Sequence, residues 1–182
     1  MPPRVVILGT GPNGLPYHSQ LDGYIIGVNA AIEIRPLDIW IIGDPRVLEY
    51  SYVREPKHDA QLKVFSHKVI ADAPDLIPDY MFKPVLILGR ELTRGACYSG
   101  VTNAGIAMQL AWQAGARELI LCGLDLFGDK HFDGSDNPHV RAAYGTGEWG
   151  QLRKMNILVR QLQAEGVNVK SVSPTAIEGV YG

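Results

Sequence analysis

A glycine-rich segment near the start of this 182-residue chain has the composition of a ligand-binding turn. Residues 9–14 read GTGPNG and directly follow a short apolar run at residues 4–8. Backbone N–H groups in such a turn can hold a phosphate or a sugar hydroxyl, because glycine leaves room for close approach. The alternative is a tight turn without a ligand. The residues expected to contact a ligand are Thr10, Gly11 and Asn13.

The same segment matches the G-x-G-x-x-G pattern of dinucleotide-binding proteins, but its surroundings do not. That motif needs a helix after the loop and an acidic residue about 20 positions on, for the ribose hydroxyls. Only nine residues separate Gly14 from Tyr24, and they include Pro16 and Gly23. Asn29 stands 20 positions after the first glycine. The sequence therefore disfavours NAD binding.

A second candidate anion site lies where a predicted helix begins. Residues 98–100 read YSG, and an alanine-rich stretch follows from Thr102 to Ala114. The first N–H groups of a helix are unpaired and carry a positive partial charge. Ser99 and Gly100 are predicted to form a phosphate cradle, and the alternative is that these residues only cap the helix.

Two polar residues follow buried runs. Asn29 ends the second apolar run, and its amide can both donate and accept hydrogen bonds from a base or ribose. Its alternative role is to cap the next helix. Asp125 follows the apolar run at residues 118–122 and could bind a ribose, a sugar or a divalent ion. A single carboxylate is weak evidence for a metal, so no metal site is predicted.

Residues 129–150 form a polar stretch without periodicity that follows a strand end. Such a stretch is expected to be a lid or active-site loop, and the alternative is a surface excursion. It contains His131 and His139, each of which could be a general base because imidazole titrates near neutral pH. Their alternative role is that of surface residues.

Apolar runs alternate with helical stretches along the chain. The runs lack polar alternation, which is typical of parallel strands buried on both faces. Predicted helices cover Thr102–Ala114, Gln151–Glu165 and Pro45–Tyr52. The sequence therefore predicts an α/β, Rossmann-like three-layer sandwich with a mostly parallel sheet of six or seven strands. The predicted strands are Arg4–Leu8, Tyr24–Val28, Asp38–Ile42, Leu62–Phe65, Val85–Leu88, Glu118–Cys122 and Val167–Val172. Two segments break this rhythm: 129–150 and the proline-rich 53–84.

Composition narrows the function classes further. The length fits a single domain, residues 1–182, and a net charge of -2 lacks the basic field of a nucleic-acid binder. No apolar run approaches the about 20 residues that cross a bilayer, and no signal peptide is evident. Cys97 and Cys122 form no CxxC motif, which argues against disulfides or structural zinc and predicts a cytoplasmic location. Cys122 is expected in the core.

Taken in order, these motifs resemble the bacterial sialyltransferases of glycosyltransferase family 42. They also resemble phage and motility-accessory-factor relatives of that family, a group that includes 6-hydroxymethylpterin diphosphokinases. The most distinctive part is the Ser-Gly helix start followed by a strand that ends in Gly-Leu-Asp. The segments that carry the resemblance are 9–15 (GTGPNGL), 26–29 (IGVN), 98–100 (YSG), 115–125 (GARELILCGLD) and 172–175 (VSPT).

The resemblance implies a transferase that uses a CMP-type nucleotide sugar, without a catalytic metal ion. In the sialyltransferases a histidine deprotonates the acceptor hydroxyl, and tyrosine hydroxyls stabilise the leaving phosphate. The residues implied to contact the nucleotide are Thr10, Gly11, Asn13, Asn29, Ser99 and Gly100. Asp125 is a further nucleotide-binding candidate, from its place after a predicted strand.

This chain departs from the family pattern at the catalytic positions. Phe127 and Phe132 stand after Gly-Leu-Asp and have no hydroxyl, and Glu148 lies where the base histidine is expected. His131, His139 or Glu148 would have to serve as the base. The segment around His131 is closer to the phage and motility-factor branch. Two alternatives stay open: Mg²⁺-dependent pyrophosphoryl transfer from ATP near Asp44 or Asp125, and a non-catalytic phage-type binding protein.

Overall fold

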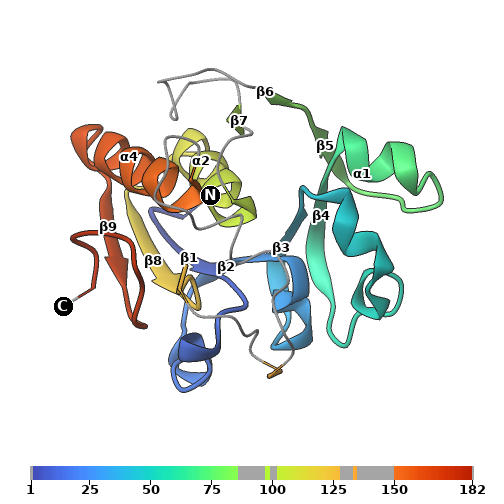
Figure 1. The fold of residues 1–182 in the computed structure, drawn as a ribbon, viewed down its shortest axis with the longest axis horizontal. Coiled ribbons are helices and arrows are strands. Elements are labelled where there is room, and N and C mark those ends of the chain that lie inside the picture. Colours follow the sequence, from blue (N-terminus) through green and yellow to red (C-terminus); the bar gives the residue numbers. More distant parts are fainter. Residues whose placement is uncertain (1, 86–96, 99–101, 128–132, 135–149, 182) are drawn as a thin grey trace.

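A seven-stranded, all-parallel sheet forms the centre of the protein in the computed structural model, which describes residues 2–85, 97–98, 102–127, 133–134 and 150–181 (Figure 1). The strand order is β5-β4-β3-β2-β1-β8-β9. The strands are β1 (Arg4–Leu8), β2 (Tyr24–Val28), β3 (Leu37–Ile42), β4 (Ala60–Ser66), β5 (Tyr80–Phe82), β8 (Glu118–Cys122) and β9 (Asn168–Ser171).

The central strands are buried on both faces, as their unbroken apolar runs predict. In β1, Val5 and Ile7 pack into one hydrophobic core, while Val6 and Leu8 pack into another. Successive side chains of a strand point to opposite faces, so each core lies on its own side of the sheet. Two layers of covering structure are therefore required, and both are present.

One face is covered by helices α2 (Asn103–Gln113) and α4 (Gln151–Ala164), which share a core with it (Figure 1). The Oγ1 atom of Thr102 caps α2 by accepting a hydrogen bond from the Gly105 N–H at 3.2 Å. The other face is covered by α1 (His67–Asp72) and by short 3-10 helices. These are η1 (Pro12–Gly14), η2 (His18–Gln20), η3 (Asn29–Glu33), η4 (Pro45–Glu49) and η5 (Ser51–Val53).

The order of the strands places a topological switch point beside β1. From β1 the chain builds β2, β3, β4 and β5 on one side, and later adds β8 and β9 on the other. β1 pairs in parallel with both β2 and β8. In open α/β sheets, ligands bind beyond the carboxyl ends of the strands at such a point. The ends of β1 and β8 therefore mark the place to look for a site.

The predicted fold class is confirmed, with local corrections. Within segment 53–84 only the strand Leu62–Phe65 was predicted; it is present as the longer β4, and α1 and β5 lie there as well. Pro45–Tyr52 forms 3-10 turns in place of an α-helix. Within the predicted strand Val85–Leu88, only Val85 is described; it belongs to β6 (Pro84–Val85), which pairs with β7 (Cys97–Tyr98) in a separate sheet. Among the described helices, none has the length and apolar character needed to cross a membrane.

Candidate functional site

The glycine-rich loop after β1 packs directly on the loop after β8. The Gly9 N–H donates to the Cys122 carbonyl and the Gly11 N–H to the Gly123 carbonyl, each at 2.8 Å. A Cβ atom added at Gly9 would lie 2.4 Å from the Gly123 oxygen. Gly123 itself has a φ of +66°, a left-handed conformation that favours glycine. The glycines are thus needed for the close approach of two backbones at the switch point.

A buried carboxylate fastens the two loops together. Asp125 is only 4% exposed, and its Oδ2 atom accepts hydrogen bonds from the Asn13 N–H at 3.0 Å and from the Asn13 Nδ2 at 2.9 Å. Its Oδ1 atom is buried and has no hydrogen-bond partner among the described residues. A Cβ atom at Gly11 would lie 2.4 Å from the Asp125 Cγ. Burial raises the pKa of Asp125, and the two hydrogen bonds from Asn13 offset part of this rise.

These contacts change the expected role of the glycine loop. The N–H groups of Gly9, Gly11, Asn13 and Gly14 all donate to protein atoms, so the expectation of free donors is wrong for these four. Thr10 makes no hydrogen bond with another described residue, which leaves its amide and hydroxyl for a ligand. No dinucleotide-type helix follows, because η1 and η2 occupy the connection to β2.

Asn29 is held at the end of β2 in a left-handed conformation with a φ of +51°. Its carbonyl accepts a hydrogen bond from the Trp40 Nε1 at 2.7 Å, and its Oδ1 accepts one from the Asn103 Nδ2 at 2.6 Å. The capping alternative is wrong, because Val28 occupies the N-cap of η3 and Asn29 is the first residue of that helix. Asn29 therefore joins the carboxyl ends of β2 and β3 to the start of α2.

Residues 124–127, around Asp125, are anchored by hydrogen bonds and include a strained backbone conformation. The Thr175 hydroxyl donates to the Leu124 carbonyl, and the Ala176 N–H donates to the Asp125 carbonyl at 2.8 Å. Leu126 has a φ of +54°, which is uncommon for a residue with a bulky side chain. Phe127 follows it and is 45% exposed. A phenyl ring in this position adds aromatic surface beside the site but no hydrogen-bond donor.

Neither proposed magnesium position is free of protein partners. The Asp44 side chain caps η4 by accepting from the Arg46 N–H at 3.0 Å, and it forms an ion pair with the Arg46 guanidinium. The hydrogen bonds that the Arg46 guanidinium donates to the Asp44 carboxylate raise the pKa of Arg46. Asp125 is committed to Asn13. Within the described ranges, no group of three or more His, Cys, Asp or Glu residues is arranged to hold a metal ion.

Several predicted site residues lie outside the described residues. They include the proposed phosphate cradle and every candidate base, so these roles stay predictions. The residues are Ser99, Gly100, His131, His139 and Glu148.

Cys122 is a core residue, as expected. Its side chain is fully buried, and its thiol lies 3.5 Å from the Gly14 carbonyl oxygen. Burial raises its pKa to about 11, with a smaller contribution from the negative charge of Asp125. A thiol with so high a pKa is a poor nucleophile near neutral pH.

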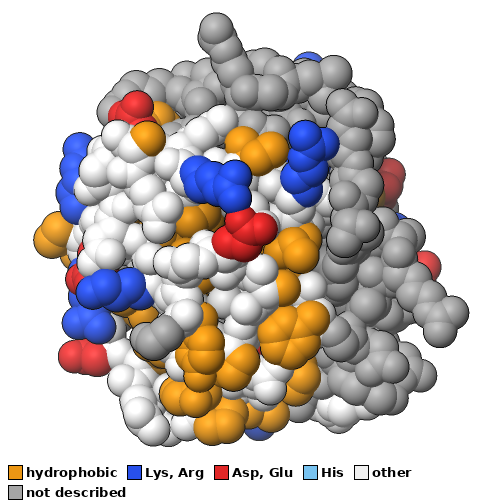
Figure 2. All heavy atoms as spheres, turned by 60° about the vertical axis from the view of Figure 1, so that its left-hand side comes forward, with side chains coloured by type: hydrophobic (Ala, Val, Ile, Leu, Met, Phe, Trp, Pro, Cys, Tyr) orange, Lys and Arg blue, Asp and Glu red, His pale blue; other side chains and the backbone are white. Residues whose placement is uncertain are grey.

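The surface around β9 and α4 carries scattered charges. Figure 2 shows Lys and Arg side chains at separate places, with hydrophobic side chains gathered in the lower half of the view. Some cations are paired, as Arg160 is with Glu178 and Arg4 with Glu118. On the described part of this face, the charges form no continuous basic field of the kind that binds duplex nucleic acid.

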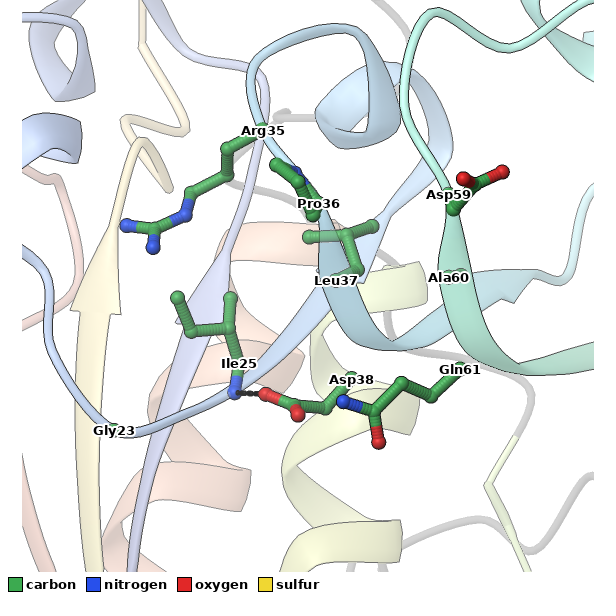
Figure 3. Close-up of a pocket in the computed structure, with 9 residues that line it drawn as sticks. All are labelled: Gly23, Ile25, Arg35, Pro36, Leu37, Asp38, Asp59, Ala60 and Gln61. Atoms are coloured by element: carbon green, nitrogen blue, oxygen red, sulfur yellow. Dashed lines mark hydrogen bonds between the residues drawn. The ribbon is translucent and has the colours of Figure 1, made fainter.

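A pocket of about 310 Å³ lies at the opposite edge of the sheet, where β2, β3 and β4 begin (Figure 3). One guanidinium nitrogen of Arg35 donates to the His18 and Leu21 carbonyls at 2.9 and 3.0 Å. Asp38 accepts from the Ile25 N–H at 2.7 Å. Arg35 and Asp38, which line the pocket, thus bind the backbone of neighbouring segments. The pocket also lies away from the switch point, so we place the candidate site at the carboxyl edge of the sheet.

Comparisons with known proteins agree on the fold. No family model and no curated protein matches the sequence. Among solved structures, the sialyltransferase CST-II with a trisaccharide acceptor and CMP matches with a TM-score of 0.62 and 14% identity, over 98% of this chain and 85% of that one. The α-2,3-sialyltransferase Cst-I from Campylobacter jejuni gives 0.63 and 12%, over 98% and 79%. CstII from Campylobacter jejuni with the substrate analogue CMP-3FNeuAc gives 0.59 and 13%, over 99% and 85%.

This chain therefore has the Rossmann-like fold of the sialyltransferases. At these identities the likeness establishes the fold alone. The neighbours agree with the sialyltransferase part of the resemblance and give no support to its phage-type and motility-factor branch.

Sequence reasoning missed the role of Asn103 in this site. Asn103 binds the side chain of Asn29, 74 positions earlier in the chain, a contact that the sequence pattern does not predict. Asn103 also packs against Gly43, which follows β3. The only local signal was a polar residue next to Thr102, at the start of the predicted helix Thr102–Ala114.

Proposed function

We propose that this protein is a nucleotide-binding transferase that uses a CMP-type nucleotide sugar. The observation that carries the proposal is the convergence of Thr10, Asn13, Asn29 and Asp125 at the switch point of a fold shared with CMP-bound sialyltransferases. Thr10 has an amide and a hydroxyl without described partners, and the Asn29 NH2 group likewise donates to no described residue. These groups suit the acceptor atoms of a base, ribose or phosphate.

The remaining roles are taken by residues outside the described ranges. Ser99 and Gly100 would hold the phosphate at the start of α2, where helix N–H groups favour an anion. One of His131, His139 or Glu148 would take the proton of an acceptor hydroxyl. The acceptor oxygen then bonds to the anomeric carbon while the bond from that carbon to the phosphate oxygen breaks, releasing CMP. Phe127 cannot donate a hydrogen bond to that phosphate.

The first prediction concerns nucleotide binding to the whole protein. CMP at about 100 times its Kd is expected to add about 2.7 kcal/mol to the free energy of unfolding, without Mg²⁺. For a chain of this size the melting temperature would rise by about 5–10 °C. Thermal unfolding with CMP, CDP, UDP, ATP and NAD, with and without Mg²⁺, measures this effect.

Ser99→Asp provides the matched variant, because a negative charge at the helix start repels a phosphate. It is expected to abolish the shift caused by CMP. Stabilisation by ATP only with Mg²⁺ would replace glycosyl transfer with pyrophosphoryl transfer. The absence of a shift with every nucleotide would contradict the proposed function.

A further inference from the structure

We propose that Asn103 is a specificity-determining residue, which fixes the Asn29 amide so that Asn29 offers a ligand its NH2 group. The inference rests on the proposed function and deepens it. It names the kind of atom that the site accepts at the end of β2: a hydrogen-bond acceptor such as a carbonyl, ring nitrogen or phosphate oxygen.

The backbone of Asn29 is rigidly placed. Its carbonyl accepts from Trp40 Nε1 at 2.7 Å, and Trp40 is buried with its ring edge-to-face against Phe65 at 5.4 Å. A left-handed conformation in a residue other than glycine persists when its surroundings hold it there, and such residues cluster at functional sites. The Asn29 side chain therefore leaves a fixed backbone in a fixed direction.

The amide of Asn29 is turned by its contact with Asn103. The Asn103 Nδ2 donates to the Asn29 Oδ1 at 2.6 Å, so that oxygen faces the start of α2. The oxygen and the nitrogen of a planar amide point in different directions, so the NH2 group of Asn29 points away from Asn103. That NH2 group donates to no other described atom.

The orientation of Asn103 is itself determined by Gly43. A Cβ atom placed on Gly43 would lie 2.3 Å from the Asn103 Oδ1, so the oxygen faces the Cα–H of that glycine. A Cα–H group is a weak donor, which suits an oxygen better than an NH2 group. Gly43 is held in turn, because its carbonyl accepts from the Ser66 hydroxyl at 2.8 Å. With its oxygen on Gly43, Asn103 has its NH2 group for Asn29.

A freely rotating asparagine would bind a donor or an acceptor equally well. The contacts from Gly43 to Asn103 and from Asn103 to Asn29 remove that freedom. A ligand group that can only donate hydrogen bonds, such as an ammonium, therefore finds no acceptor on the Asn29 side chain. CMP carries acceptors on its base and its phosphate, and it meets the requirement. Asn103 thus selects ligand groups that accept hydrogen bonds, although it does not contact the ligand itself.

Asn103→Asp tests the inference by reversing the polarity. A carboxylate only accepts, so Asn29 would turn its NH2 group toward residue 103 and present its oxygen to the ligand. Affinity for CMP, measured by isothermal titration calorimetry, is expected to fall about tenfold or more, the equivalent of one lost hydrogen bond. Asn103→Ala removes the contact without reversing it, and a loss of about threefold is expected. Urea unfolding of both variants confirms that they are folded.

Charge repulsion alone is excluded by salt and by a matched variant. Salt at about 0.5 M NaCl screens a repulsion between charges, but it does not turn an inverted amide back. The loss of CMP affinity in Asn103→Asp is therefore expected to be as large at about 0.5 M as at about 0.05 M NaCl. Gln61→Glu makes the same change from amide to acid at the opposite edge of the sheet and is expected to leave binding unchanged. Wild-type affinity in Asn103→Asp, or a loss that high salt removes, would overturn the inference.

Nuclear magnetic resonance of the side-chain amides separates this inference from the proposed function. In the free protein, the Asn103 NH2 resonance is expected to be shifted by its hydrogen bond and to move in Asn29→Ala. A hydrogen-bonded Asn29 NH2 group instead would overturn the orientation whether or not CMP binds. Failure of the wild-type protein to bind CMP, with the amide orientation as described, would refute only the proposed function and the ligand class built on it.

Discussion

Replacing Gly9 with alanine is expected to lower the free energy of unfolding by about 3 kcal/mol and to remove stabilisation by CMP. The added methyl group would lie 2.4 Å from the Gly123 carbonyl oxygen and 2.4 Å from a methyl group of Leu124. The oxygen belongs to the backbone, so it cannot rotate away. The two loops would have to separate, and their hydrogen bonds at 2.8 Å would weaken with the site that they form.

Gly115→Ala is the matched control for this prediction. Gly115 has a φ of +98°, and an added Cβ atom would meet nothing within 4 Å. Only backbone strain is therefore introduced, at a cost of about 1 kcal/mol, and CMP binding should be unchanged. Urea unfolding of both variants gives the two free energies. Equal losses in the two variants would show that loop packing at Gly9 is not the cause.

The sheet could be predicted because its signal is local. The runs at β1, β2 and β8 have no polar residue after the first one, and the observed bounds equal the predicted ones. The edge strand β5 carries no such signal, since Tyr80 and Met81 are exposed and the strand has only three residues. Helix α1 was missed for a similar reason, because its six residues are too few to show a clear helical period.

The site was predicted only as far as strand ends reveal it. Residues that follow parallel strands lie at one edge of the sheet, so Asn29, Asp125 and the glycine loop were expected near one another. Which of their groups remain free depends on partners far away in the chain. Asn13 and Asp125 are separated by 112 positions, and no local pattern predicts a contact at that distance. The loop that was expected to offer its N–H groups to a ligand instead spends four of them on the protein.

Asp125→Ala is expected to reduce turnover of a CMP-sugar about 100-fold and CMP affinity about tenfold. The reason is that the glycine loop would lose both hydrogen bonds that Asn13 donates to the Asp125 carboxylate. The Asn13 N–H would be left without its acceptor, at a cost of about 1–3 kcal/mol in stability. Asp125→Asn keeps an oxygen for that N–H and is expected to restore most of the affinity. Turnover is measured by the release of CMP, and CMP affinity is measured by calorimetry.

The pH dependence of stability tests whether the Asp125 carboxyl is buried in the folded protein. Burial raises the pKa of Asp125, so the native state holds the proton more tightly than the unfolded chain does. The contribution of this group to stability is therefore present below its ordinary pKa of 3.8 and is lost as the pH rises through the raised value. Relative to Asp125→Asn, whose side chain at this position does not titrate, the wild-type protein should lose stability as the pH rises from the ordinary pKa of 3.8 through the raised pKa of Asp125.

If Asp125→Asn lost turnover and affinity as fully as Asp125→Ala, the negative charge itself would be required, and the carboxylate would have to contact the ligand. The geometry argues for the anchor, because Oδ2 accepts two hydrogen bonds from Asn13 and Oδ1 is buried against Gly11. A ligand could reach this carboxylate only if the loop moved. The expected pattern is thus rescue of turnover and affinity by asparagine, together with loss in that variant of the part of the pH dependence of stability that Asp125 contributes.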